Sequence, residues 1–73
     1  MRIGDRVIVD KLRYDMQVYY SYKNWYSPVG YKGEVVAYYP PTENSEEYVA
    51  VKLDNWPYNK GLLCFNLDEL RYE

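Results

Sequence analysis

The chain contains no histidine and a single cysteine, Cys64, among its 73 residues. Histidine is the commonest general base and metal ligand of proteins, and one cysteine cannot build a structural zinc site. The carboxylate pairs Glu46-Glu47 and Asp68-Glu69 are sequence neighbours in segments expected to be exposed turns, rather than members of a pocket. We therefore expect neither an enzyme nor a bound cofactor or metal ion.

A lone cysteine also cannot form the internal disulfides that secreted domains of this size usually need. Its expected place within a strand indicates a small buried side chain rather than an activated nucleophile. No apolar run approaches the roughly 20 residues of a membrane span, and no charged N-terminal region leads into an apolar stretch. These absences predict a cytoplasmic protein that does not span a membrane.

Positive charge is not in excess either, because nine Lys and Arg residues stand against eleven Asp and Glu residues, for a formal net charge of -2. Phosphate neutralisation dominates the affinity of proteins for nucleic acids, so general nucleic-acid binding is disfavoured. Hydrophobic residues make up 48% of the chain and aromatic residues 19%. This composition predicts one small folded domain over residues 1–73.

Alternating apolar positions and chain-breaking residues predict short β-strands. Five are expected: residues 6–9, 31–39, 48–54, 62–65 and 70–73. Asn66 followed three positions later by Glu69 has the spacing of a capping box, which predicts one helical turn before the last strand. No window of eleven or more residues shows a convincing helical period, so the predicted class is all-β.

Five short strands in so small a chain favour a closed β-barrel, since closure removes exposed strand edges. The predicted interior consists of apolar side chains that share one face of their strands. These residues are Ile3, Val7, Val9, Val35, Val49, Val51, Leu53, Leu63, Phe65, Leu67 and Leu70. A core of this size is thin.

Four motifs carry a family resemblance: GDRVIVD at 4–10, GYKGEVVAY at 30–38, YVAVKLDN at 48–55 and CFNLDELRY at 64–72. Together they resemble the small Src-homology-3-like (SH3-like) barrels, and among these the KOW-type and related bacterial and phage barrels. The resemblance implies a five-stranded barrel that binds peptides or nucleic acids and has no chemistry of its own. The chain lacks the Ala-Leu-Tyr-Asp-Tyr first loop of the signalling members and the basic charge of the ribosomal ones.

Aromatic residues concentrate in YDMQVYYSYKNWY, residues 14–26, which holds five tyrosines and a tryptophan. In an SH3-like barrel this segment lies in the long connection between the first two strands. Its alternation predicts a hairpin-like excursion that turns near Lys23-Asn24. The apolar face of that hairpin, with Met16, Val18 and Tyr20, would close the open end of the barrel.

The other rings of this excursion predict a contact surface, because exposed aromatic clusters on small domains mark binding sites. The SH3-like topology places the acidic connection 40–47 beside them. Aromatic walls with an acidic rim would suit a Lys- or Arg-bearing segment of a protein partner. The candidate partner-binding residues are Tyr19, Tyr22, Trp25, Tyr26, Tyr39, Tyr48, Glu43, Glu46 and Glu47.

The predicted function is a non-enzymatic protein-binding module, of a kind that fits phage-type accessory regulators or inhibitors of a host complex. One alternative is a KOW-like nucleic-acid module, with tyrosines for base stacking and six cations as phosphate contacts: Arg2, Arg6, Lys11, Arg13, Lys23 and Lys32. A second alternative is a carbohydrate-binding module with Trp25 and Trp56 as stacking platforms.

Trp56 and Tyr58 lie in the turn between the third and fourth predicted strands, at the end of the barrel opposite the aromatic excursion. We expect them to pack against the sheet edge; if exposed, they would form a second patch. Exposed rings of one copy could also pair with those of another in a homodimer.

Overall fold

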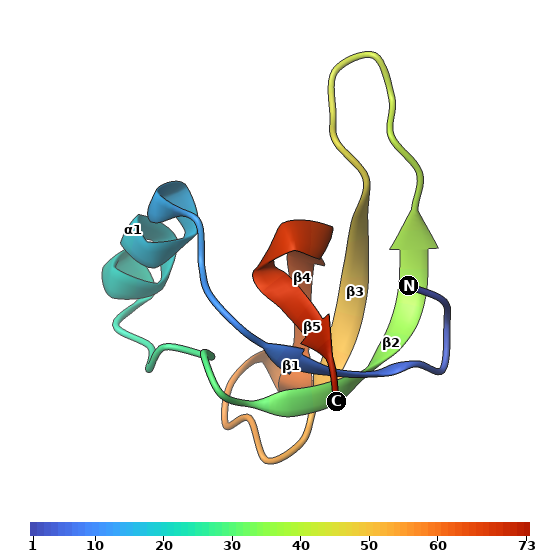
Figure 1. Cartoon of the computed structure of the whole chain (residues 1–73). Helices are drawn as coiled ribbons and strands as arrows, with labels where there is room; N and C mark the ends of the chain where they lie inside the picture. Colours follow the sequence, from blue (N-terminus) through green and yellow to red (C-terminus); the bar gives the residue numbers. More distant parts are fainter.

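The computed structural model describes residues 1–73 and contains five strands, one α-helix and two 3-10 turns (Figure 1). The strands are β1 (Arg6–Val9), β2 (Lys32–Tyr39), β3 (Tyr48–Leu53), β4 (Leu62–Asn66) and β5 (Leu70–Tyr72). The helix is α1 (Tyr14–Lys23), and the 3-10 turns are η1 (Asn59–Gly61) and η2 (Leu67–Glu69). All five predicted strands are confirmed to within one residue at each end, and the structure is mostly β.

All neighbouring strands pair antiparallel, in the order β4-β3-β2-β1-β5. The outer strands β4 and β5 do not pair with each other, so the sheet stays open instead of closing into the predicted barrel. The long strand β2 pairs with both β1 and β3, and its register shifts at a bulge between Val35 and Ala37. A bulge bends the strand that contains it, and Figure 1 shows β2 curving from β1 towards the long β2–β3 connection.

The curved sheet encloses one hydrophobic core on its inner face. Nine of the eleven predicted interior residues are buried: Val7, Val9, Val35, Val49, Val51, Leu53, Leu63, Phe65 and Leu70. Leu67 is partly buried and packs against them. The prediction for Ile3 is wrong, because this side chain is 67% exposed and precedes β1 in a turn.

The aromatic segment does not form the predicted hairpin: residues 14–23 are α1. Met16 and Tyr20, four positions apart, lie on the same side of the helix and pack on the core, as predicted. Val18 is 50% exposed, so its prediction as part of the closing face is wrong. The helix ends at Asn24, which adopts the left-handed conformation (φ 58°, ψ 36°) and donates its backbone N–H to the carbonyls of Ser21 and Tyr20. No helix of the structure is long and apolar enough to cross a membrane.

Glu69 fastens the helix to the sheet and is completely buried, so its prediction as an exposed turn residue is wrong. Its Oε1 accepts the backbone N–H of Asn66 at 2.9 Å, which confirms the predicted capping box. Its Oε2 accepts the backbone N–H of Arg13 at 2.9 Å, directly before α1. Its own carbonyl accepts the N–H of Asp10 at 2.8 Å and that of Lys11 at 3.3 Å. One side chain thus joins η2 to the start of the helix.

Candidate binding surface

Rings from α1, the loop after it and the β3–β4 turn form one aromatic cluster. Trp25 stacks on Tyr58, with centroids 5.0 Å apart and planes 8° from parallel. Trp56 is only 6% exposed and meets Tyr31 edge-on at 5.0 Å, and it also contacts Tyr20, Trp25 and Tyr58. Trp56 therefore packs locally, as predicted. The expectation that Trp56 and Tyr58 lie at the opposite end from Trp25 is wrong.

Trp25 is engaged within the chain rather than presented to solvent. It is half-buried, Tyr58 covers one face of the indole, and Lys23 Nζ lies 5.5 Å from its centroid and 5.7 Å from that of Tyr19. The Nε1 of Trp56 is buried without a hydrogen-bond acceptor, among rings that stand nearly perpendicular to the indole. Trp56 is buried and cannot serve as the stacking platform expected for a sugar, whereas Trp25 keeps partial exposure with one face stacked on Tyr58.

A second aromatic pair lies at the base of the β2–β3 connection. Tyr39 and Tyr48 are direct cross-strand neighbours, and their rings stack with centroids 4.7 Å apart. Next to them, the Tyr38 hydroxyl donates to Glu47 at 2.6 Å, and this hydrogen bond raises the pKa of Tyr38. The pair keeps much of its surface exposed, since Tyr39 is 43% accessible.

The outer face of the sheet changes character along its strands. Cross-strand partners share a face, and towards β1 the outer partners are charged: Arg6 with Glu34, and Glu34 with Lys52. Beyond the bulge, and along β4, where Leu62 is the cross-strand partner of Lys52, the outer positions carry no charge. They are Val36, Ala37 and Tyr39 on β2, Tyr48 and Ala50 on β3, and Leu62 and Cys64 on β4. We call this set the apolar half of the outer face.

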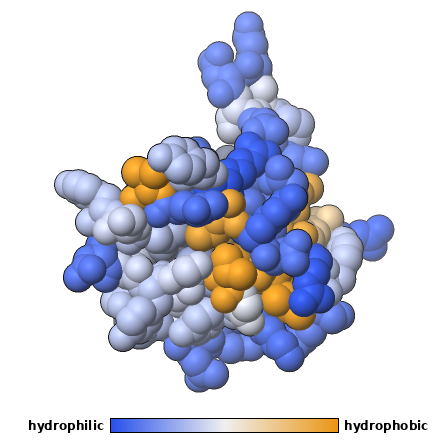
Figure 2. Space-filling view, turned by 60° about the vertical axis from the view of Figure 1, so that its left-hand side comes forward, coloured by the Kyte–Doolittle hydropathy of each residue, from blue (hydrophilic) through white to orange (hydrophobic).

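A groove of about 500 Å³ runs from α1 past β4 onto the apolar half. Figure 2, which brings the α1 side of the molecule forward, shows hydrophobic residues reaching the surface in a group bordered by hydrophilic ones. Ten of the eleven lining residues are hydrophobic. They are Met16, Tyr19 and Tyr20 from α1, Val36, Ala37 and Tyr39 from β2, Ala50 from β3, and Leu62, Leu63 and Cys64 from β4; the eleventh is Asn59.

Cys64 opens into this groove and is exposed, so the prediction that it is buried is wrong. It lies on the outer face because its cross-strand partner is Ala50, whereas its neighbours Leu63 and Phe65 point into the core. Its apolar surroundings desolvate the thiolate and raise the pKa of the thiol. The thiol is therefore less ionised than an ordinary cysteine and poorly suited to act as a nucleophile.

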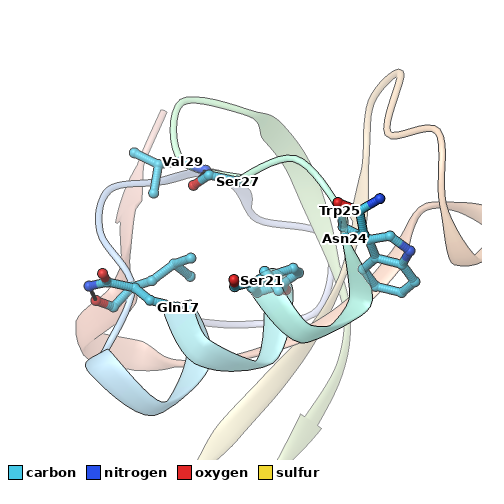
Figure 3. A pocket seen from close by; sticks show the side chains of 8 residues that line it. Gln17, Ser21, Asn24, Trp25, Ser27 and Val29 are labelled. Atoms are coloured by element: carbon cyan, nitrogen blue, oxygen red, sulfur yellow. Dashed lines mark hydrogen bonds between the residues drawn. The ribbon is translucent and has the colours of Figure 1, made fainter.

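A second pocket, of about 530 Å³, lies between α1 and the loop that follows it. Figure 3 shows Gln17 and Ser21 on the helix facing Ser27 and Val29 across this space. Gln17 Nε2 donates to the Leu12 carbonyl at 3.0 Å, and Ser27 Oγ accepts the Val29 N–H at 3.3 Å. No charged side chain lines the pocket, whose remaining residues are Leu12, Tyr20, Asn24 and Trp25.

Two of the three acidic candidates are held within the chain. The Arg13 guanidinium hydrogen-bonds to Glu46 and to Asp68, and its bond to Glu46 holds the pKa of that carboxyl below its usual range. This ion pair brings the β2–β3 connection to the start of α1. Glu47 accepts the Tyr38 hydroxyl, while Glu43 is exposed in the turn that the Thr42–Ser45 bridge closes at the tip of the connection.

Of the predicted aromatic candidates, the groove unites Tyr19 and Tyr39, and Tyr48 stacks on Tyr39. Tyr26 is 67% exposed and contacts only Tyr58 among the rings, so it lies at the edge of the cluster. Tyr22 is 86% exposed on α1 and lines neither pocket described above. The predicted set therefore falls into separate places rather than one site.

The sequence interpretation missed the aliphatic part of the surface. Val36, Ala50 and Leu62 line the groove, yet none of them was a candidate. The sequence did contain a signal for it. The outward positions Val36 of β2, Ala50 of β3 and Leu62 of β4 are apolar, although the outward positions of an antiparallel sheet are usually polar.

Three of the eight remaining basic side chains are also paired with carboxylates. Arg6 bonds to Asp54 and Glu73, Lys32 lies 3.5 Å from Glu73, and Arg71 lies 3.3 Å from Asp10. Together with Arg13, this pairing takes up three of the six cations considered as phosphate contacts. No group of three or more Cys, Asp or Glu residues is arranged to hold a metal ion.

No protein-family model matches the chain, and neither a curated protein nor a solved structure is significantly similar to it. The geometry of this surface is therefore the basis for the functional inference.

Proposed function

We propose that this chain is a non-enzymatic protein-binding module whose contact surface is the apolar half of the outer face together with the adjoining side of α1. One observation carries the proposal: β2 and β3 present charged residues at one end of their outer face, whereas their other end and the neighbouring strand β4 present only uncharged, mostly apolar residues. A solvated face of an antiparallel sheet is ordinarily polar throughout. Apolar surface rimmed by polar residues is typical of contact sites.

The accessible surface of the chain indicates what fraction of it such an interface would bury. A stable protein interface buries roughly 800 Å² on each partner, and the accessible surface of the chain is 4974 Å². The interface would therefore cover about one sixth of the molecule. The groove alone is smaller than this, so its exposed tyrosine margins, Tyr19 and Tyr39, belong to the proposed surface.

The architecture we propose for the open sheet is SH3-like. The strand order, the 3-10 turn before the last strand and the motifs of β1, β2 and β3 support this proposal. A scaffold of this kind without a catalytic group acts by occupying a surface of its partner. A phage-type regulator or inhibitor of a larger complex is the role that we propose for it.

Charge pairing favours a protein partner over a nucleic acid. Arg6, Arg13 and Lys32 are each within ion-pair distance of a carboxylate of the same chain. Phosphate contacts would have to displace these partners, and the released carboxylates would repel the backbone of the nucleic acid.

Two substitutions on the same strand and the same face test the proposal. Val36→Gln places an uncharged polar group on the apolar half, and Glu34→Gln, two residues away, makes a matched change on the charged half. Both sites are exposed, so both variants should fold, which circular dichroism and urea unfolding will verify. Affinity capture from the cells that encode the chain is then compared between wild type, Val36→Gln and Glu34→Gln.

The expected result is a protein captured by wild type and Glu34→Gln and lost, by tenfold or more, with Val36→Gln. If the two folded variants capture the same proteins in equal amounts, the apolar half is not the contact surface. Recovery of the chain itself as the only ligand would show a homodimer instead of a partner complex.

A carbohydrate-binding role is a second candidate, favoured by the uncharged polar pocket of Figure 3. Gln17, Ser21, Asn24 and Ser27 can exchange hydrogen bonds with hydroxyl groups, and Leu12 and Val29 supply apolar contact. Titration with neutral monosaccharides, followed by NMR, should then shift the amide signals of these residues. Signals that stay unchanged at saturating sugar would remove this candidate, and Ser21→Val would serve as the matched control.

A further inference from the structure

The strand β4 lies at the edge of the sheet, since it pairs only with β3. In an antiparallel pair, alternate residues direct their backbone groups towards the partner strand and away from it. The backbone groups of Leu62 face away from β3, because both bond to Asn59 instead. The Leu62 N–H donates to the Asn59 carbonyl, and the Leu62 carbonyl accepts a hydrogen bond from Asn59 Nδ2 at 2.8 Å. Leu62, Cys64 and Asn66 therefore direct their backbone groups to the open edge.

Both ends of this edge are satisfied within the chain. Asn59 occupies the groups of Leu62, and Glu69 Oε1 accepts the N–H of Asn66 at 2.9 Å. Between them, the N–H and C=O of Cys64 take part in no hydrogen bond outside the regular strands and helices. Since they face away from β3, they form one unfilled position in the backbone ladder.

The groove borders this unfilled position. Its lining includes Leu63, whose side chain enters the core, as well as Leu62 and Cys64, whose side chains lie on the outer face. Met16 and Tyr20, which pack on the core, line this space together with the outer-face residues of β4, so the space lies against the β4 edge. Across this space, Met16 and Tyr19 of α1 form the opposite wall. An apolar groove between an edge strand and a helix suits an extended peptide that adds to the sheet as a further strand.

The charges at the two ends of β4 differ in sign. At the Asn66 end, a hollow of about 240 Å³ is lined by Glu46, Glu47 and Asp68 against the single cation Arg13, which leaves three negative charges against one positive charge. At the Leu62 end the charged side chains are Lys52 and Lys60, and Lys52 Nζ donates to the Lys60 carbonyl at 2.7 Å. A segment that lies along β4 would therefore place its basic residue at the Asn66 end.

We propose that the groove binds an extended segment of the partner protein as a sixth strand on β4. The segment pairs its backbone with the N–H and C=O of Cys64, places alternate apolar side chains against the apolar half and α1, and carries Lys or Arg at the Asn66 end. This rests on the proposed protein-binding function and names the form of the partner. The favoured occupant is a free segment rather than a second copy, because the β4 edge of a second copy would bring its own α1 into the same narrow space.

The probe is a phage-displayed library of random nonapeptides, selected on the full-length chain. Enriched peptides should alternate apolar residues and carry Lys or Arg at one end. Synthetic peptides from this selection are then methylated at one backbone nitrogen at a time. A methyl group on a nitrogen that faces β4 should weaken binding by more than tenfold, whereas methylation of the adjacent nitrogens, which face away, should change it by less than threefold.

Hydrogen–deuterium exchange, read residue by residue by NMR, supplies a measurement that needs no variant. In the free protein the Cys64 amide should exchange faster than the amides of Leu63 and Phe65, which bond to β3. Saturating peptide should slow the exchange of Cys64 by at least tenfold.

The outcomes separate this inference from the proposed function. Suppose that wild type captures a partner and Val36→Gln does not, but the Cys64 amide exchanges equally fast with and without that partner. The strand-addition inference is then overturned, and the binding function stands. If neither the peptide library nor the cell extract yields a ligand, both fail. Protection of Cys64 in the free protein that grows with protein concentration would assign the edge to a second copy and overturn the inference.

Discussion

Replacement of Glu69 by alanine should remove about half of the stability of this protein, although the residue lies in a short turn. Glu69 is completely buried, and its two side-chain oxygens accept the backbone N–H groups of Asn66 and Arg13, each at 2.9 Å. Alanine would leave both donors without acceptors, together with a small cavity. The first turn of α1 would also lose its attachment to η2.

The magnitude follows from the number of donors left unpaired. Each buried polar group without a partner costs about 1 to 3 kcal/mol, so the two N–H groups together cost about 2 to 6 kcal/mol. A chain of this length has a total unfolding free energy of about 4 to 11 kcal/mol. The loss therefore removes about half of the stability. Glu69→Gln keeps one acceptor oxygen and should lose roughly half as much as alanine.

Urea unfolding followed by far-ultraviolet circular dichroism measures these losses, and Glu43→Ala provides the control. Glu43 is exposed at the tip of the β2–β3 connection, and its substitution should change the unfolding free energy by less than about 0.5 kcal/mol. If Glu69→Ala destabilises the protein by no more than the Glu43 control, water or another group satisfies the two N–H donors. The role assigned to Glu69 would then be wrong.

Three further predictions concern packing and ionisation. Gly33→Ala should destabilise the protein by roughly 3 kcal/mol in urea unfolding, because a Cβ there would lie 2.5 Å from the Lys52 carbonyl oxygen in the middle of the sheet. Hydrogen bonding to Arg6 holds the pKa of Asp54 below its usual range, so this pair stabilises the fold above about pH 4 and the contribution is lost as pH falls through the lower, folded-state pKa. Thermal unfolding at pH 7 and pH 3 should therefore show a smaller acid-induced decrease for Arg6→Met than for wild type, and equal decreases would contradict this reasoning. Burial raises the pKa of Tyr20, so the unfolded chain ionises first and stability falls as pH rises above about 10. An ultraviolet titration should show a late-ionising tyrosine that Tyr20→Phe removes.

The strands could be predicted because apolar and polar residues alternate along them, and this alternation follows which side chains are buried. Val49, Val51 and Leu53 alternate with less buried residues and face the core, as predicted, and the Asn66 to Glu69 spacing produced the expected turn. The helix could not be found in the same way. Only Tyr20 of α1 is buried, and tyrosines also occupy the exposed sides of the helix. The apolar residues of this segment therefore show almost no helical periodicity.

The candidate site was predicted only in part, and for a related reason. An abundance of rings suggested that some must be exposed, and Tyr19, Tyr26 and Tyr39 are indeed exposed. Contacts between segments far apart in the sequence decide which rings are exposed. Trp25, one of the predicted contact residues, stacks on Tyr58 and is engaged within the chain.

Residue types and their spacing determined which strands form and which of their faces are apolar, because these properties depend on neighbours along the chain. Only the tertiary structure decided that Glu69 is buried, that Cys64 faces a groove and that α1 stands opposite the β4 edge. These features arise where segments far apart in the chain meet. Their energies depend on geometry that no local pattern of residues specifies.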